Sequence, residues 1–234
     1  MEALLLFAPA VVVMALLLVF AWKRHQQMHP KVLLPAIPAD VRLGVQDETP
    51  EARAFMEQYR EFIADFNRAG NPMQYRQLVD LLACGPRSLA ALAAADLAAS
   101  GMLGRYASDL ELRNELGEIA AWNARRVAER SDLVSLFALL ARLVELGGHN
   151  EDALDVWFGP QEADLRASDC PRRRALAVAL LSRLGSPRQK QAAADAAAGE
   201  TELQAELTAE TSSAPLPPDV GEPLPTYAEA YHAE

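Results

Sequence analysis

The sequence predicts an all-α protein: an N-terminal transmembrane helix, then a multi-helix soluble domain, then a disordered acidic tail. The chain begins with an uncharged apolar run. Helix-capping residues recur at intervals through its middle part. Its last residues are rich in Ser, Pro and acids and have no core-forming pattern. No segment alternates polar and apolar residues as a β-strand does. We therefore expect a body built from helices packed on one another.

Residues 1–22 are predicted to be a membrane anchor. Residues 3–22 carry no charge, and a helix of about twenty residues spans the roughly 30 Å hydrocarbon core of a bilayer. A cleaved signal peptide is the alternative, but it needs a basic start, a shorter apolar core and a small-residue cleavage site. The run instead follows Met-Glu and ends in Trp-Lys-Arg, which favours an uncleaved anchor.

The flanks of this segment predict its orientation. Lys23, Arg24 and Lys31 follow the span and no basic residue precedes it, so the positive-inside rule places the body in the cytosol. The chain has only two cysteines, Cys84 and Cys170, and no Asn-x-Ser/Thr glycosylation acceptor, which agrees with that side of the membrane. Both cysteines are expected to be buried as small hydrophobic residues.

Residues 23–48 are predicted to be a juxtamembrane stalk. Pro30, Pro35 and Pro38 discourage regular structure there. Several Val, Leu and Ile residues nevertheless lie between positions 32 and 45, which a purely solvated linker would not carry. We expect this segment to pack on the folded body or to lie along the membrane interface.

Residues 49–186 are predicted to form a helical domain of six to eight helices. Thr49-Pro50-Glu51 supplies an N-cap, a proline at the first helical position and an acid in the first turn. Ser108, in a capping box with Glu111, and Ser131 are expected to cap two later helices. The expected helices cover about 50–69, 72–84, 86–100, 109–130, 132–146, 151–158 and 171–184.

Two apolar stripes at helical spacing identify the core-facing sides of these helices. They comprise Phe55, Tyr59, Phe62, Ile63 and Phe66, and Leu133, Leu136, Phe137, Leu140, Leu143 and Val144. Residues 187–210 are rich in Ala, Glu and Gln and can form one more helix with little apolar stripe. Residues 211–234 are predicted to be a disordered, Pro-containing acidic tail.

The charge is unevenly distributed along the chain. Residues 23–190 contain 22 basic and 22 acidic residues, whereas residues 191–234 contain nine acidic residues and no Lys or Arg. A neutral body with an acidic tail argues against nucleic acid as a partner.

No catalytic, cofactor or metal site is predicted, and the protein is expected not to be an enzyme. His25, His29, His149 and His232 do not have metal-ligand spacing with cysteine or acid. The sequence also has no glycine-rich phosphate loop and no nucleophile elbow.

The tail contains a candidate ligand motif for WW domains. Leu224, Pro225, Thr226 and Tyr227 resemble Leu-Pro-x-Tyr ligands, and an extended polyproline segment loses little entropy when it binds an aromatic groove. The alternative is an inert solubilising tail. Tyr227 and Tyr231 are also candidates for phosphorylation, which the sequence does not decide.

A basic cluster opens one of the expected helices. Arg172, Arg173 and Arg174 lie where positive charge opposes the helix dipole. The favoured interpretation is a solvated face that pairs with nearby acids. The alternative is a patch for an anionic partner, either lipid or an acidic segment such as the chain's own tail.

Three stretches resemble, in the same order, segments of the NICE-three family of single-pass membrane proteins. They are residues 40–47 (Asp-Val-Arg-Leu-Gly-Val-Gln-Asp), 157–162 (Trp-Phe-Gly-Pro-Gln-Glu) and 183–186 (Arg-Leu-Gly-Ser). That family also begins with a transmembrane helix, Lys-Arg and a proline-containing stalk. The resemblance covers well under half of the chain. It implies a membrane-bound regulator linked to phagocytosis, with Golgi and mitochondrial association, and it assigns no functional residue.

The sequence thus predicts a membrane-anchored, non-enzymatic interaction, adaptor or regulatory protein. Its expected partners are the lipid bilayer and other proteins, including a WW-domain protein that binds the tail. The resemblance implies a role in phagocytosis or membrane trafficking, and the Golgi or another endomembrane is the favoured location. The alternative is an accessory structural subunit of a membrane complex, with a mitochondrial membrane as the other candidate location.

Overall fold

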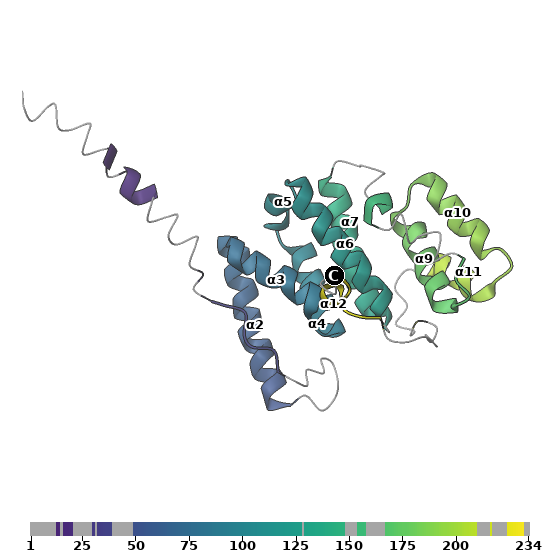
Figure 1. Ribbon diagram of the computed structural model, residues 1–234, viewed down its shortest axis with the longest axis horizontal. Helices are drawn as coiled ribbons and strands as arrows, with labels where there is room; N and C mark the ends of the chain where they lie inside the picture. Colours follow the sequence, from purple (N-terminus) through teal and green to yellow (C-terminus); the bar gives the residue numbers. More distant parts are fainter. Residues whose placement is uncertain are drawn as a thin grey trace, which may run out of the picture. The chain divides into compact units, whose positions relative to one another are not determined.

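The computed structural model describes residues 13–14, 16–20, 30, 32–38, 49–127, 129–147, 154–157, 167–209, 216 and 224–231. Within these ranges every regular element is a helix and no residue is in a strand (Figure 1), so the all-α prediction is confirmed there. The contacts divide the chain into two units. The first comprises residues 1–40 and 46–77, and the second comprises residues 41–45 and 78–234.

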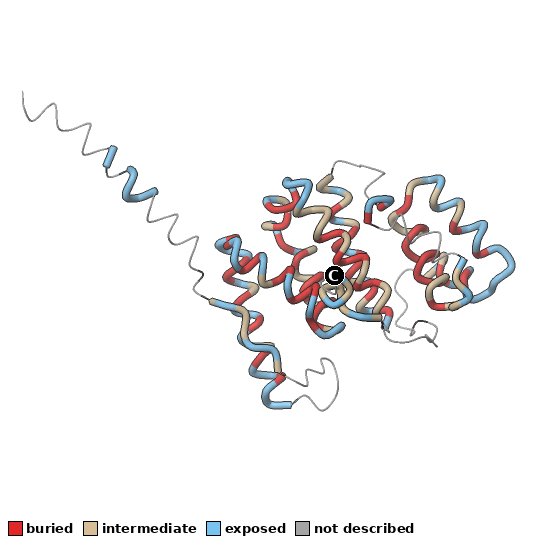
Figure 2. The backbone as a smooth tube through the Cα atoms, in the orientation of Figure 1, coloured by how far each residue is buried: buried red, intermediate tan, exposed pale blue. Residues whose placement is uncertain are grey.

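The predicted anchor, residues 1–22, lies mostly outside the described residues. Only residues 13–14 and 16–20 of it are described, and they are helical and exposed (Figure 2). Across the described part of the chain, no helix combines the length and the apolar character needed to cross a bilayer.

In the first unit, helix α2 (Pro50–Ala69) has the predicted boundaries. The Thr49 hydroxyl oxygen accepts a hydrogen bond from the Ala52 amide at 3.2 Å, which confirms the N-cap. Gly70 ends the helix in the left-handed conformation, with φ 58°. The predicted aromatic stripe is buried at four of its five positions, and Ile63 is half-buried. The buried members are Phe55, Tyr59, Phe62 and Phe66.

Residues 32–38 of the predicted stalk are extended and run alongside α2 (Figure 1). The fully buried Gln74, in helix α3 (Pro72–Cys84), holds this segment. Its side-chain amide donates to the Val32 carbonyl at 2.8 Å and to the Asp65 carboxylate at 3.1 Å. The Leu34 amide donates to the Gln77 side chain at 3.4 Å. This part of the stalk therefore packs on the helices of the first unit.

In the second unit the end of α3 is followed by α4 (Arg87–Ala99), α5 (Leu103–Tyr106), α6 (Leu110–Arg126) and α7 (Arg130–Leu146). Helices α4 and α6 both pack on α7. The predicted apolar stripe of α7 is buried except at Val144, which is half-buried. Asn123 on α6 donates to the carbonyls of Leu82 at 2.8 Å and Ile119 at 2.9 Å, which joins α6 to the end of α3.

Three predicted helix boundaries in this region are wrong. Asp109, not Ser108, caps α6, because its carboxylate accepts from the amides of Glu111 at 2.9 Å and Leu112 at 3.2 Å. The Ser108 hydroxyl instead donates to the Arg105 carbonyl at 2.9 Å. Helix α6 ends at Arg126 and not near Arg130. Helix α7 begins at Arg130, so Ser131 lies inside its first turn and is not its N-cap.

Gly117 on α6 makes room for a tryptophan. Residues 154–157 form a helical turn within the predicted short helix, whose remaining residues lie outside the described ranges. Trp157 is 4% exposed, and its indole donates to Asn114 at 3.3 Å. A Cβ atom at Gly117 would lie 2.2 Å from Cε2 of Trp157. Only glycine therefore allows the indole to pack so closely on α6.

We expect Gly117→Ala to lower the free energy of unfolding by about 1–3 kcal/mol, because the methyl group overpacks the Trp157 site. This loss outweighs the better helix propensity of alanine, which is worth about 1 kcal/mol. Urea unfolding followed by circular dichroism measures it. Gly101→Ala is the control, since nothing lies within 4 Å of its added Cβ. Equal stabilities of the two variants would contradict the packing of Trp157 on Gly117.

The C-terminal part of the second unit contains α9 (Pro171–Leu184), α10 (Pro187–Ala197) and α11 (Thr201–Thr208). Both α10 and α11 pack on α9, and the outer side of α10 is exposed (Figure 2). The single helix expected over 187–210 is therefore two helices. Gly199 lies between them with φ 91°, a conformation that ends helices and favours glycine. Their shared apolar cluster is Ala175, Val178, Ala197 and Leu203.

The prediction that residues 211–234 are disordered is wrong for residues 224–231. These residues are ordered and include helix α12 (Tyr227–Tyr231). Leu216 is also described and buried, whereas the rest of the tail lies outside the described residues. The prediction that both cysteines are buried is wrong as well, because Cys84 at the end of α3 is exposed and Cys170 is half-buried.

Candidate functional site

The described end of the tail folds as a capped helical turn. The Thr226 hydroxyl oxygen accepts from the Glu229 amide at 3.1 Å, and the Thr226 amide donates to the Glu229 carboxylate at 2.7 Å. These reciprocal bonds form a capping box. Tyr227 and Tyr231 are four residues apart and so share one face of α12. Their rings stack with centroids 4.5 Å apart.

Trp122 on α6 is the centre of the contact with this tail segment. Its indole N–H donates to the Pro225 carbonyl at 3.0 Å. Its ring meets Tyr227 and Tyr231 edge-on, with centroids 6.4 and 6.0 Å away. The Arg125 guanidinium lies over the same indole, 4.9 Å from its centroid. Trp122 is therefore engaged through its N–H, through two perpendicular ring contacts and through a cation over its ring.

Acidic side chains surround the Tyr227 hydroxyl. Burial is the largest cause that raises its pKa, to about 12, followed by the negative charges of Glu118 and Glu115 and a hydrogen bond with Glu118. The neutral phenol is therefore the form that fits this site. Hydrogen bonds from Thr226 lower the pKa of the Glu229 carboxyl, so Glu229 caps α12 as a carboxylate.

Arginines gather at the C-terminal end of α6. Burial is the main cause that lowers the pKa values of Arg125 and Arg126, and the charges of Arg173 and Arg87 respectively lower them further. The tail opposes this effect, because Tyr231 raises the pKa of Arg125 and Glu229 raises that of Arg126. The acidic tail thus lies beside a basic helix end, where cations also favour the helix dipole.

The titration of Tyr227 is a direct prediction of this geometry. We expect its pKa at about 12 in the full chain and near 10 when Trp122→Ala releases the tail. Because the folded value is raised, docking is fully favoured below about pH 10 and is lost as the pH rises through about 12. NMR of ring-labelled tyrosine, assigned with Tyr227→Phe, measures both values. A Tyr227 pKa near 10 in the full chain would contradict the docked position.

The three arginines that open α9, Arg172, Arg173 and Arg174, are not all exposed. Arg172 is buried and Arg173 is half-buried. Arg174 donates to the Ser168 carbonyl at 2.8 Å and to the Glu200 carboxylate at 3.1 Å. Arg174 is therefore already bound to a backbone carbonyl and a carboxylate.

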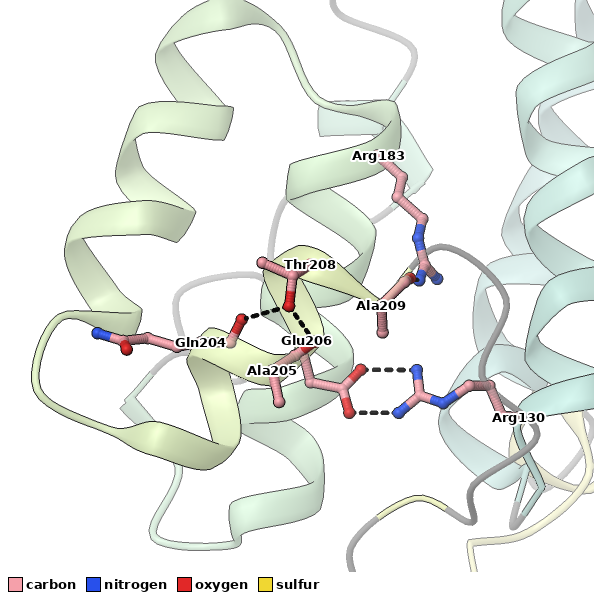
Figure 3. Close-up of polar contacts among 7 residues, drawn as sticks. All are labelled: Arg130, Arg183, Gln204, Ala205, Glu206, Thr208 and Ala209. Carbon is pink, nitrogen blue, oxygen red and sulfur yellow. Dashed lines mark hydrogen bonds and ion pairs between the residues drawn. The ribbon is translucent and has the colours of Figure 1, made fainter.

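A second polar cluster joins α7, α9 and α11 (Figure 3). Arg130 and Glu206 are buried and form a two-bond ion pair, in which one nitrogen–oxygen distance is 2.7 Å. Arg183 donates to the Ala209 carbonyl at the end of α11 and lies 5.7 Å from the Phe137 ring centroid. Burial is the main cause that lowers the pKa of Arg183, and the Arg130 charge adds to it. These groups bind one another, and the cluster is structural.

Acidic, histidine and cysteine side chains give no metal centre within the described ranges. No three or more of them come close enough together there to hold a metal ion. All four histidines fall outside the described residues, as does most of the stretch 157–162. Of the sequence-predicted features, the structure brings together the tail motif and α6.

Comparisons of the chain with protein-family models, with curated proteins and with solved structures found no match. The tail motif is visible in the sequence, whereas no local pattern marks Trp122 as the residue it contacts. One signal for the ordered turn was present, because Thr226 and Glu229 have capping-box spacing and Tyr227 and Tyr231 have helical spacing.

Proposed function

We propose that this protein is a membrane-anchored, non-enzymatic interaction or regulatory protein that presents a peptide motif from its tail. The contact of Trp122 with Pro225 and the two tail tyrosines carries the proposal. It joins a helical body to a Leu-Pro-Thr-Tyr motif through one hydrogen bond and ring edges. A contact of this small size is reversible, which suits a ligand that is exchanged between partners.

The anchor limits where the motif is presented. Residues 3–22 are uncharged and are followed by Lys23 and Arg24, which supports a membrane helix with a cytosolic body. The chain is held again at Val32 by Gln74. Ten residue steps from Trp22 to Val32 reach at most about 35 Å. The first helical unit would therefore stay close to the bilayer surface.

The resemblance to the NICE-three family supports a location at the Golgi or another endomembrane and a role in phagocytosis or membrane trafficking. An accessory subunit of a membrane complex is the alternative, with a mitochondrial membrane as its location. Blue-native electrophoresis separates the two, because an adaptor also migrates as a small species, whereas a subunit migrates only in a large assembly. Alkaline extraction should leave the full chain in the membrane fraction and a chain lacking residues 1–22 in the supernatant.

A binding panel tests the proposed role of the tail. The full chain in detergent micelles is incubated with purified WW domains, and the retained domains are identified. We expect the full chain to retain domains that recognise Leu-Pro-x-Tyr, and Tyr227→Ala to lose them, because the tyrosine fills the aromatic groove. Pro217→Ala, in the other proline cluster of the tail, is the matched control and should keep them. Retention of every WW domain by Tyr227→Ala would rule out the proposed ligand.

A further inference from the structure

We propose that the surface of α6 formed by Glu118, Trp122, Arg125 and Arg126, here called the tail receptor, binds residues 224–231 of the same chain and masks the motif. A WW domain then binds the motif only after the tail has left the receptor. This inference rests on the proposed function, because it names how the same motif is regulated.

The receptor recognises several features of the tail at once. Trp122 donates to the Pro225 carbonyl at 3.0 Å across 103 residues of sequence. The edge contacts of its ring require both Tyr227 and Tyr231 on one side of a helical turn. A helix of five residues is not stable by itself. The two hydrogen bonds between Thr226 and Glu229 cap this turn and so help to hold it.

Charge complementarity supports the same occupant. The chain from residue 191 onward contains acids and no Lys or Arg, and the receptor ends in Arg125 and Arg126. The carboxylate of Glu229 acts electrostatically on Arg126. Glu118 supplies the acceptor for the neutral Tyr227 hydroxyl. An acidic segment with a neutral phenol at its first helical position fits this arrangement of groups.

The docked and the WW-bound forms of the motif are mutually exclusive. WW domains bind proline-containing ligands as extended polyproline helices and bury their side chains in an aromatic groove. On the receptor, Tyr227 is instead the first residue of α12 and stacks on Tyr231, and the Pro225 carbonyl is already bonded. The same tyrosine cannot occupy both sites, so the two binding events compete.

The strength of the contact between the tail and the tail receptor determines how far the affinity for a WW domain is reduced. One hydrogen bond and two aromatic edge contacts favour the docked tail over the free tail on the order of tenfold to a hundredfold. The apparent affinity of the full chain for a WW domain falls by the same factor, because only the undocked fraction is competent to bind. Masking of this strength is overcome by a WW domain at a sufficiently high local concentration.

The test compares three ligands for one WW domain that binds Leu-Pro-x-Tyr peptides, with dissociation constants from isothermal titration calorimetry. The ligands are a synthetic peptide of residues 211–234, the full chain in detergent micelles and its Trp122→Ala variant. We expect the peptide and the variant to bind alike and the full chain about tenfold or more weakly. Arg142→Ala, at an exposed position of α7, is the control and should bind like the full chain. Circular dichroism confirms that each variant is folded.

A second measurement distinguishes a failure of the tail receptor from a failure of the proposed WW-domain function. A fluorescein-labelled peptide of residues 211–234 is added to the full chain carrying Tyr227→Ala and Tyr231→Ala, whose receptor is vacant. Binding in trans, abolished by a further Trp122→Ala, supports the receptor even where the peptide binds no WW domain and the proposed function fails. Equal WW affinity of the peptide and the full chain would overturn the masking, as would a vacant receptor that does not bind the labelled peptide.

Discussion

Replacing Glu206 with alanine is expected to lower the free energy of unfolding by about 3–5 kcal/mol, because it leaves the charge of Arg130 buried without its partner. Both residues are nearly inaccessible, with 4% and 5% of their surfaces exposed. The pair also holds α11 against α7 (Figure 3). A loss of this size is a large part of the stability of an ordinary domain. Urea unfolding of the full chain in detergent measures it.

Two further variants show whether the loss of stability in Glu206→Ala comes from the burial of the ion pair. Glu145→Ala removes a partner of Arg142 that is 60% exposed and 2.7 Å away, and an exposed pair of this kind contributes less than about 1 kcal/mol. The double variant Arg130→Met with Glu206→Leu should be about as stable as the natural chain, since buried ion pairs can be replaced by apolar groups of similar volume. Equal losses for Glu206→Ala and Glu145→Ala would show that the Arg130–Glu206 pair is not buried.

Gln74→Glu, which replaces an amide nitrogen with oxygen, is expected to destabilise the first unit by at least about 3 kcal/mol. Gln74 is fully buried, and its amide donates to the Val32 carbonyl and the Asp65 carboxylate. The introduced carboxylate can donate to neither group and places a second negative charge beside Asp65. We also expect residues 32–38 to detach from α3, which hydrogen exchange of their amides reports.

The matched control and the pH dependence sharpen this prediction. Gln77 is half-buried and accepts from the Leu34 amide, so Gln77→Glu keeps the required acceptor and should cost less than about 1 kcal/mol. Burial raises the pKa of the carboxyl introduced by Gln74→Glu. The part of the loss that comes from the buried charge is therefore complete above that raised pKa and disappears as the pH falls below about 4.3. The protonated carboxyl still has one donor in place of the two of Gln74, so a smaller loss remains at low pH. A loss that does not depend on pH would contradict the buried position of Gln74.

The boundaries of the longer helices could be predicted because their signals are local. Pro50, Pro72, Pro171 and Pro187 each stand at the first helical position, where proline lacks only a donor that the helix does not use. The apolar stripe of α7 likewise follows from helical periodicity. The error at Ser108 was also local, since a serine and an aspartate adjoin and either can cap a helix.

The tail contact could not be predicted from local pattern. Helix α12 is shorter than any helix that is stable alone, and it depends on Trp122, which lies 103 residues before Pro225. The composition of the tail shows that it is acidic and poor in core-forming residues. Such a composition predicts disorder. It could not indicate that two tyrosines at helical spacing would find an aromatic partner on α6.

The buried polar groups were missed for the same reason. Arg130 and Glu206 are 76 residues apart, and nothing in the local sequence of either distinguishes it from a solvated surface charge. Arg172 was expected in a solvated face and is buried. Burial of a charged side chain depends on which helices pack over it, and that information lies in the tertiary structure.

The most direct test of the central claim, that the tail motif is docked on Trp122, is a nuclear Overhauser spectrum of the full chain with labelled tryptophan and tyrosine. We expect cross-peaks from the Trp122 indole proton to the ring protons of Tyr227 and Tyr231. We expect their loss in Thr226→Ala, which removes the cap of α12. A Trp122 indole signal without cross-peaks to either tyrosine, unchanged by Thr226→Ala, would contradict the docked tail.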